Sequence, residues 1–385
     1  MGPIRSSSMC WLVLLAVSAL PLQGQAAPAL SVGFYDWGGM YPASLSQGMD
    51  AIASVGGHIA RLAISPRMDI DYNMGSVCIP GFTLADAIQD PDVKNAIDNP
   101  AISVFILTAY DGVTFGDCIS HKYLVPAFYT AANQAAIVQE YSDLTLYLYQ
   151  TYQHTNKRFI ISNWESDNDI YCGQAGHYAT DTAFRSFCNN TYLLTYGNTS
   201  PADSLLGMKL WFQAREQGIE DGRNRALALG IGGMRVYFAP EVSITRCLHD
   251  AGLQSVLYDV VPNVKFDYVS YSAYESMSMP DPRTALLQDL ETIQDVAGSS
   301  AVLIGEMMIS SHGVDTNDPQ TLRQVMDAAL AWGVPYLIYW NLYAPSNIAC
   351  GLFDTSGQIT AIGKFFEEYL PGIRACGPIS HRSIY

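Results

Sequence analysis

Two kinds of block alternate along the chain from Leu30 onward. Short apolar runs rich in β-branched and aromatic residues are typical of buried strands, and longer segments with apolar residues three and four apart are typical of helices. The pattern predicts eight strands, at Ser31–Tyr35, Ile59–Ile64, Ile102–Thr108, Arg158–Asn163, Met234–Phe238, Tyr268–Ser272, Ala301–Gly305 and Tyr336–Trp340. It predicts helices between them, at Leu45–Val55, Leu84–Ala96, Ala131–Gln153, Ser204–Ala228, Thr245–Asp259, Pro282–Val296, Pro319–Trp332 and Ala361–Tyr369.

Alternation of this kind favours a closed parallel sheet with helices outside it, which is a (β/α)8 TIM barrel in a single α/β domain. An open doubly wound sheet is the alternative, but no GxGxxG or phosphate-binding loop follows the first strand. The run Gly230–Gly233 precedes a strand and is interpreted as a turn. The longest insertion, 166–202, follows the fourth strand, so we expect it on the face of the barrel where barrel enzymes have their active sites.

The first 26 residues have the pattern of a secretory signal peptide. Arg5 precedes the apolar run Trp11–Val17, and small residues follow up to Ala26, after which cleavage is expected. The apolar run is too short to span a bilayer, although an uncleaved anchor is the alternative. We therefore expect a mature barrel domain at 27–385 that is extracellular, or periplasmic in a Gram-negative host, and not attached to a membrane.

The composition and charge of the chain limit the classes of molecule that this domain is expected to bind. The chain has 385 residues, is 49% hydrophobic and 15% charged, and has a formal net charge of -16. An acidic chain without a basic patch repels polyanions, so we expect no nucleic-acid partner, whereas a neutral glycan is compatible with this charge. Asn189–Thr191 and Asn198–Ser200 are acceptor triplets for N-linked glycans. The oligomeric state is left open.

Eight cysteines are present, one of them in the signal segment. In a secreted chain the other seven favour disulfides over metal ligation. No CxxC pair occurs and the histidines have no ligand spacing, so we expect no metal and no cofactor. Cys172 and Cys188 lie in the insertion, and Cys78 and Cys118 lie in the loops after the second and third strands. These two pairs are the predicted disulfides.

Two glutamates follow apolar strands, Glu165 after the fourth and Glu306 after the seventh. A carboxylate in that position is costly unless it has partners or lies in a cleft. Three strand-helix units separate the two residues, which places them across the barrel mouth from each other. Glycoside hydrolysis needs such a pair, because one carboxyl group protonates the leaving oxygen while the other attacks the anomeric carbon or activates water. The alternative for each glutamate is a salt bridge at the rim.

The order of these motifs resembles that of the clan A glycoside hydrolases. Those are retaining barrel enzymes with the acid/base on strand four and the nucleophile on strand seven, so the resemblance implies these roles for Glu165 and Glu306. Arg61 is similar to the clan's strand-two arginine, which supports the nucleophile. Tyr274 is similar to the strand-six tyrosine that hydrogen-bonds the nucleophile, and Trp340 matches the strand-eight tryptophan under the sugar.

Two positions depart from the clan pattern. The clan usually has asparagine immediately before the acid/base, whereas here one residue separates Asn163 from Glu165. A bulge would restore the usual geometry; otherwise Asn163 does not reach the sugar 2-hydroxyl, and Asp167 or Asp169 is an alternative acid. Ser272 stands where many members have histidine. The chain is therefore a divergent member of the clan or belongs to a neighbouring family.

The chemistry sets requirements on the surroundings of both glutamates. Glu165 needs a raised pKa, which desolvation by Trp164 and Tyr171 would favour, and Glu306 needs to stay ionised, which Arg61 would favour. Glu275 is the main rival carboxylate. Further residues after strand ends are candidate substrate contacts: Asp36, Trp37, Tyr110, Asp111, Glu241, His312, Asn341 and Tyr343.

Together these features favour a retaining O-glycosidase that acts on an oligo- or polysaccharide. A barrel that binds glycan without cleaving it, and a transglycosylase that uses the same residues, are the alternatives. The sugar, the linkage and the choice between exo and endo action do not follow from the sequence.

Overall fold

A computed structural model describes residues 31–37, 44–72, 78–192, 200–233, 235–298, 300–308, 318–343 and 350–375. The expected signal segment 1–26, Met234, His312, Cys376 and the second glycan acceptor at Asn198 lie outside these ranges. Within them, no helix combines the length and the apolar character needed to cross a bilayer.

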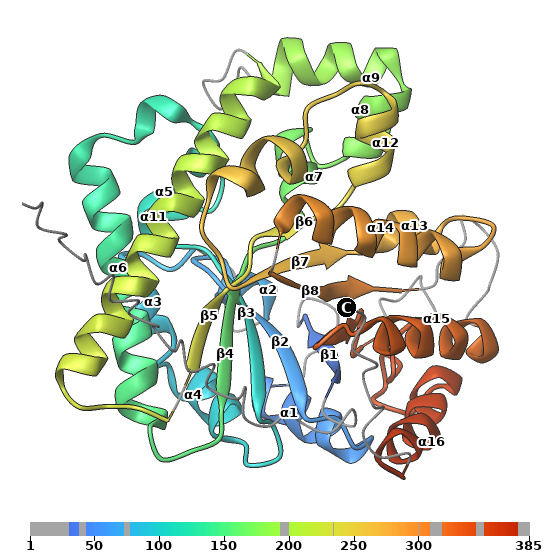
Figure 1. The fold of residues 1–385 in the computed structure, drawn as a ribbon. Coiled ribbons are helices and arrows are strands. Elements are labelled where there is room, and N and C mark those ends of the chain that lie inside the picture. Colours follow the sequence, from blue (N-terminus) through green and yellow to red (C-terminus); the bar gives the residue numbers. More distant parts are fainter. Residues whose placement is uncertain are drawn as a thin grey trace, which may run out of the picture.

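The strands form one parallel sheet in the order β5-β4-β3-β2-β1-β9-β8-β7-β6 (Figure 1). The prediction of eight strands is confirmed with ends shifted by one or two residues, and the fifth strand is in two pieces. The strands are β1 Val32–Asp36, β2 Ile59–Ile64, β3 Val104–Ala109, β4 Arg158–Ser162, β5 Arg235–Phe238, β6 Glu241–Val242, β7 Tyr268–Ser272, β8 Ala301–Met307 and β9 Leu337–Tyr339.

The two ends of this order, β5 and β6, belong to one short segment and are separated only by Ala239 and Pro240. Proline has no N–H to donate to a ladder, so the segment changes neighbours there. The N–H of Ala239 donates to Ile161 on the β4 side (2.9 Å), while the carbonyl of Pro240 accepts from Ser270 of β7 (2.9 Å). Because one segment pairs on both sides, the ring is closed, and the predicted (β/α)8 barrel is confirmed.

Helices lie outside the ring of strands (Figure 1). The longer ones are α1 Leu45–Ser54, α4 Pro91–Asp98, α6 Ala131–Tyr152, α11 Pro201–Ala228, α14 Pro282–Ala297, α15 Pro319–Trp332 and α16 Ala361–Ala375. Short helical turns fill the loops: α2 Met68–Asp71, α3 Leu84–Ala87, α5 Gly112–Phe115, η3 Lys122–Leu124, η4 Pro126–Phe128, α7 Ser166–Ile170, α8 Ala175–Thr180, α9 Thr182–Phe187, η5 Cys188–Tyr192, α12 Thr245–Asp250, η6 Val256–Val260, η7 Val261–Asn263 and α13 Tyr274–Met277.

The prediction of one continuous helix is wrong for two segments. The segment 84–96 is divided into α3 and α4 because the Asp90 side chain caps a new helix that begins at Pro91, a residue that suits the first helical position. The segment 245–259 is divided into α12 and η6. Gly252 follows α12 with φ 66°, a left-handed conformation that ends helices.

The strands alternate between two apolar environments. Phe34, Leu62 and Ile161 pack outward into the core shared with the helices. Ile59, Ile106, Ile160, Leu303 and Ile338 belong to a separate cluster inside the ring, together with Tyr35 and Tyr336. Arg61 comes two residues after Ile59 on β2 and therefore points inward as well, toward the carboxyl ends of the strands. The alternation of inward and outward side chains along β2 thus places the guanidinium of Arg61 at the barrel mouth.

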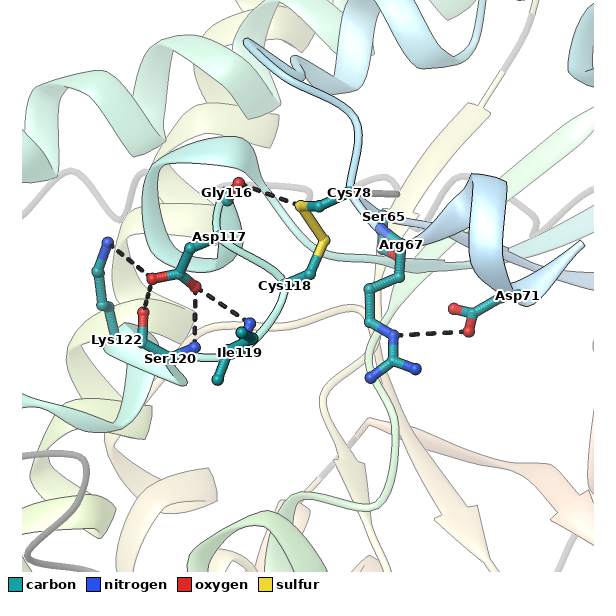
Figure 2. The surroundings of a disulfide bond; sticks show 10 residues. All are labelled: Ser65, Arg67, Asp71, Cys78, Gly116, Asp117, Cys118, Ile119, Ser120 and Lys122. Atoms are coloured by element: carbon teal, nitrogen blue, oxygen red, sulfur yellow. Dashed lines mark hydrogen bonds and ion pairs between the residues drawn. A yellow bond between two sulfur atoms is a disulfide. The ribbon is translucent and has the colours of Figure 1, made fainter. Parts of the chain in front are cut away.

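Both predicted disulfides are confirmed. Cys78 is bonded to Cys118 and joins the loop after α2 to the loop after α5 (Figure 2). Cys172 is bonded to Cys188 and closes a loop in the first part of the insertion after β4, which contains α8 and α9. Both linkages fix loops that follow barrel strands, so they restrain the face of the barrel that contains the glutamates.

Candidate active site

Glu165 lies three residues past β4, at the start of α7, and its side chain is buried. The Ser272 hydroxyl donates to its Oε1 (2.8 Å), and the Asn168 side-chain amide donates to its Oε2. Burial raises the pKa of Glu165 to about 7, while the hydrogen bonds from Ser272 and Asn168 oppose this effect. A carboxyl group with such a pKa holds a proton near neutrality, as a general acid must.

Glu306 lies in β8 and is buried beside Tyr274 and Arg61. The Tyr274 hydroxyl donates to its Oε2 (3.0 Å), and Nη2 of Arg61 is 3.3 Å from its Oε1. Among the described residues, Oε1 of Glu306 accepts no hydrogen bond. Burial raises the pKa of Glu306 well above its usual value, whereas the charge of Arg61 lowers it. Tyr274 therefore orients one oxygen of the group, and the other is buried beside Arg61 without a hydrogen bond from the described residues.

The carboxyl end of β7 brings the two glutamates together. Ser272, which binds Glu165, is the register partner of Glu306 on β8. Tyr274, two residues later, binds Glu306. The charge of Glu165 also raises the pKa of Glu306, as expected for two like charges in one buried site. The structure thus brings both predicted glutamates to one place on the barrel mouth.

Arg61 has a different principal partner from the one expected. Its Nη1 and Nη2 donate to the two carboxylate oxygens of Glu241 (2.7 and 3.1 Å), and its Nε donates to Thr108 (2.8 Å). Glu306 is a second ion-pair partner without a hydrogen bond. Glu241 is fully buried, so it does not fit the predicted role of a substrate contact. Its sequence signal was the one used for the other two glutamates, a carboxylate directly after buried apolar positions.

Asn163 contributes to the site by holding a turn. Its Nδ2 donates to Ser166 (2.7 Å), and its Oδ1 accepts from the N–H of Glu241 (3.1 Å). Both ends of the buried amide are therefore committed to the protein. The structure does not bring Asn163 to a position where it would contact a substrate, and the separation of Asn163 from Glu165 by one residue is the local reason.

Tryptophans directly follow two of the strands at the mouth, β1 and β9, and a third precedes Glu165. Trp340 and Trp37 are both half-buried and pack against the cluster inside the ring. The Trp340 ring meets Tyr274 edge to face, with centroids 6.5 Å apart, and the Trp340–Asn341 peptide bond is cis. Trp164 is 36% exposed beside Glu165. Exposed faces of this kind suit the C–H side of a sugar ring.

Two predicted contacts have their partners within the protein. The carboxylate of Asp36 lies against α1, where a Cβ on Gly48 would come within 1.8 Å of its Oδ2. Burial raises the pKa of Asp36 to about 7. Tyr110 is buried in an aromatic stack with Trp211, and its hydroxyl accepts from the N–H of Trp164 (3.1 Å). Tyr110 therefore supports the turn that carries Glu165.

Three other candidates have structural partners. Asp111 caps α5 and accepts from the indole of Trp211 (2.8 Å). Asn341 is buried, and its Oδ1 accepts from the N–H of Leu342 (2.7 Å). Tyr343 is buried against Phe353. None of these three positions requires a substrate to explain its environment.

The rival carboxylates also have structural roles. Glu275 accepts hydrogen bonds from the N–H groups of Arg246 (3.0 Å) and Cys247 (2.6 Å) at the start of α12. Asp167 accepts from two backbone N–H groups of other loops, at 2.8 and 3.0 Å. Asp169 is buried within 3.5 Å of the Tyr110 hydroxyl, and Tyr171 donates to a backbone carbonyl. Glu165 and Glu306, by contrast, are joined through the end of β7, where Ser272 binds one and Tyr274 binds the other.

Comparison with known proteins supports the fold. No protein-family model and no curated protein sequence matches the chain. Among solved structures, a family 1 β-glucosidase from Thermotoga maritima matches with a TM-score of 0.57 and 10% identity over 91% of this chain and 98% of that one.

Two further structures match in the same way. A GH5_18 protein from Streptomyces cattleya, in complex with GlcNAc, has a TM-score of 0.56 and 10% identity over 92% of this chain and 83% of that one. A β-glucosidase denoted 1317 has a TM-score of 0.52 and 12% identity over 87% and 88%. These neighbours are clan A glycoside hydrolases. At this identity the likeness concerns architecture, and the chain has the (β/α)8-barrel fold of the clan A glycosidases.

Proposed function

We propose that this protein is a glycoside hydrolase of the retaining type, with Glu165 as acid/base and Glu306 as nucleophile. The observation that carries the proposal is the convergence of the two carboxyl groups on the end of β7, where Ser272 binds one and Tyr274 binds the other. The resemblance of the motif order to clan A and the fold shared with its members support the same assignment.

The first chemical step follows from the two environments. The carboxylate of Glu306 attacks the anomeric carbon and forms a glycosyl ester. The hydroxyl of Tyr274 and the charge of Arg61 hold this carboxylate in place. Glu165 gives its proton to the leaving oxygen, so the aglycone departs as a neutral alcohol.

The second step reverses these roles. Glu165, now ionised, removes a proton from water, and the hydroxide attacks the anomeric carbon. The bond to Glu306 breaks, Glu306 regains its charge, and Glu165 regains its proton. Trp340 and Trp37 provide the apolar faces on which the sugar ring lies in both steps.

The substrate class is an oligo- or polysaccharide, met outside the cell after loss of the signal segment. Two disulfides that brace the active-site loops support an oxidising location. Structural neighbours include β-glucosidases and an exo-β-1,4-mannosidase from Opitutaceae bacterium strain TAV5, of whose length the chain covers 60%. Aryl β-glucosides and β-mannosides are therefore the first substrates to screen.

A glycan-binding barrel without hydrolysis is the second candidate. One observation favours it: burial raises the pKa of Glu306, and Arg61 gives its hydrogen bonds to Glu241 instead. A protonated Glu306 would not attack. The two candidates make opposite predictions for turnover.

Substitution of the nucleophile tests the proposal. Glu306→Gln should lower kcat/KM on an activated aryl glycoside by about four orders of magnitude, because the covalent step is lost. Glu165→Ala should slow hydrolysis of the glycosyl-enzyme intermediate, because water is no longer activated by a base. Added azide, which needs no base, should restore turnover with a glycosyl azide as product. Glu275→Gln, at a carboxylate held by backbone N–H groups, is the matched control and should retain turnover. Normal turnover by Glu306→Gln would refute the assignment.

A further inference from the structure

Arg61 forms ion pairs with two buried carboxylates at the barrel mouth, Glu241 and Glu306, and its charge also acts on a third, Glu165. The mouth cluster, defined here as Arg61, Glu165, Glu241 and Glu306, contains one cation and three carboxyl groups, and each side chain is at most 5% exposed. Removing charges from water is costly unless each has a partner in good geometry. The distribution of the Arg61 hydrogen bonds within this cluster therefore decides how strongly each carboxylate is stabilised.

Glu241 takes most of that stabilisation. Its two oxygens accept from Nη1 and Nη2 of Arg61 in a bidentate pair, and its Oε2 also accepts from the Ser270 hydroxyl (2.7 Å). Glu306 has only the longer contact with Nη2, at 3.3 Å. Bidentate guanidinium-carboxylate pairs are the stronger and more directional arrangement.

Glu241 also holds the turn that carries the acid/base. Its Oε1 accepts from the N–H of Glu165 (3.1 Å), its own N–H donates to Asn163 (3.1 Å), and its carbonyl accepts from the hydroxyl of Ser166 (2.5 Å). Backbone and side chain of one residue thus contact both sides of the turn. Pro240, which ends the pairing of β5 with β4, sets the position of Glu241 in the ring.

We propose that Glu241 is a positioning residue that joins the acid/base turn to Arg61 and, by holding the guanidinium, limits the positive charge offered to Glu306. This inference rests on the proposed function and deepens it. It assigns to the end of the fifth strand a part in setting the lower pH limit of turnover, which the two glutamates alone do not explain.

The groups around Glu241 and Glu306 define what a substitution would change. Titratable side chains that face them are Tyr35 from β1, Arg61 from β2, Tyr110 after β3, Glu165 and Asp169 from the β4 loop and α7, and Tyr274 after β7. Arg61 is the cation in this set. Loss of the Glu241 charge would leave Arg61 with Glu306 as its remaining buried ion-pair partner, and the ionised form of Glu306 would be favoured.

Glu241→Gln is the first variant to test, because the amide oxygen retains an acceptor for the N–H of Glu165. We expect the acidic limb of the kcat/KM profile to move about one pH unit lower, so that the ratio of variant to native kcat/KM rises about tenfold across that limb. KM near the optimum should change little. Glu275→Gln is the matched control, and its acidic limb should stay in place.

Ser270→Ala is the second variant, for use even if Glu241→Gln does not fold. Loss of the Ser270 hydroxyl removes one hydrogen-bond donor from Glu241, so the negative charge of Glu241 is less compensated and draws Arg61 more strongly. Less positive charge then acts on Glu306, and the acidic limb of the kcat/KM profile should move in the opposite direction, to higher pH. A general loosening of the fold would not move the acidic limb in opposite directions in Glu241→Gln and Ser270→Ala.

The outcomes separate the two proposals. A uniform loss of activity at all pH values in Glu241→Gln, with an unmoved limb in Ser270→Ala, would overturn the role of Glu241 and leave the two-glutamate mechanism intact. Unchanged turnover by Glu306→Gln in the same assay would overturn the mechanism itself.

Discussion

The two ends of the barrel interior each contain an arginine, and the two arginines have different partners. At the mouth, Arg61 lies among three buried carboxylates. At the amino end of the strands, Arg158 is partly exposed and donates to the hydroxyl of Tyr336 (3.1 Å). Tyr268 lies between Tyr336 and Tyr237, with ring centroids 6.1 and 5.3 Å away, and these four residues form what we call the barrel floor.

The difference shows that this fold keeps buried charges without enough partners of opposite sign at the mouth and not at the floor. The floor combines neutral hydroxyl groups with one cation that reaches solvent, an arrangement that costs little. The mouth cluster buries more negative groups than positive ones, which burdens folding but leaves pKa values that are matched to proton transfer. Substitutions at the two ends should therefore have different consequences for stability and for activity.

Removal of the mouth arginine should have the largest effect. Arg61→Met leaves the carboxylates of the mouth cluster without their cation, and loss of one partner from a buried ion pair costs about 3–5 kcal/mol. We expect a corresponding fall in the free energy of unfolding, measured by urea titration at pH 7. Turnover should be lost, because Glu306 would keep its proton.

Arg158→Met is the matched substitution at the floor. It removes one hydrogen bond from a partly exposed group, so it should cost about 1 kcal/mol and leave kcat/KM unchanged. If both substitutions lowered the free energy of unfolding equally, the burial of charge at the mouth would not make Arg61 more important for stability than Arg158.

Asp36 sharpens the comparison, because it is a buried carboxyl group near the mouth that faces away from it. Its folded pKa of about 7 lies above the usual value of 3.8, so the folded state binds its proton more tightly than the unfolded chain. That stabilisation is present below pH 4 and is lost as the pH rises through 7. Between pH 4 and pH 8, native stability should fall by about 4 kcal/mol more than that of Asp36→Asn.

Activity is the control for this second test. Asp36→Asn should retain native kcat/KM at pH 6, because the side chain lies against Gly48 on the outer side of the ring. Parallel stability curves for the two proteins would contradict the assignment of the raised pKa to burial. A loss of turnover in a folded variant would return Asp36 to the candidate substrate contacts.

Local sequence patterns predicted most of the fold but not the partners within the site. The strands bearing Arg61 and Glu306 follow from continuous apolar runs, and both disulfides follow from cysteines in neighbouring loops. The bidentate pair of Arg61 with Glu241 joins residues on opposite sides of the ring, and it depends on the change of strand partner at Pro240. Such a contact arises only from closure of the barrel, which periodicity does not encode.

Asn163 and Asp36 show the same limit at shorter range. Each stands at or just past the end of a strand and carries a polar side chain, as a substrate contact would. One extra residue in the turn directs Asn163 into the protein, and the alternation of the strand directs Asp36 there. Their direction depends on side-chain packing against Ser166 and Gly48, which the sequence pattern does not resolve.

The smallest expected effect concerns the upper pH limit of turnover. Glu165 must be protonated to act as an acid, so kcat/KM should fall as the pH rises through its pKa of about 7. The hydroxyl of Ser272 stabilises the ionised form of Glu165. Ser272→Ala should therefore raise that pKa and move the basic limb to higher pH, by about half a unit. Tyr268→Phe at the floor should leave the limb in place. A shift to lower pH in Ser272→Ala would mean that the hydroxyl stabilises the protonated acid, and a limb that does not move would point to another residue as the proton donor.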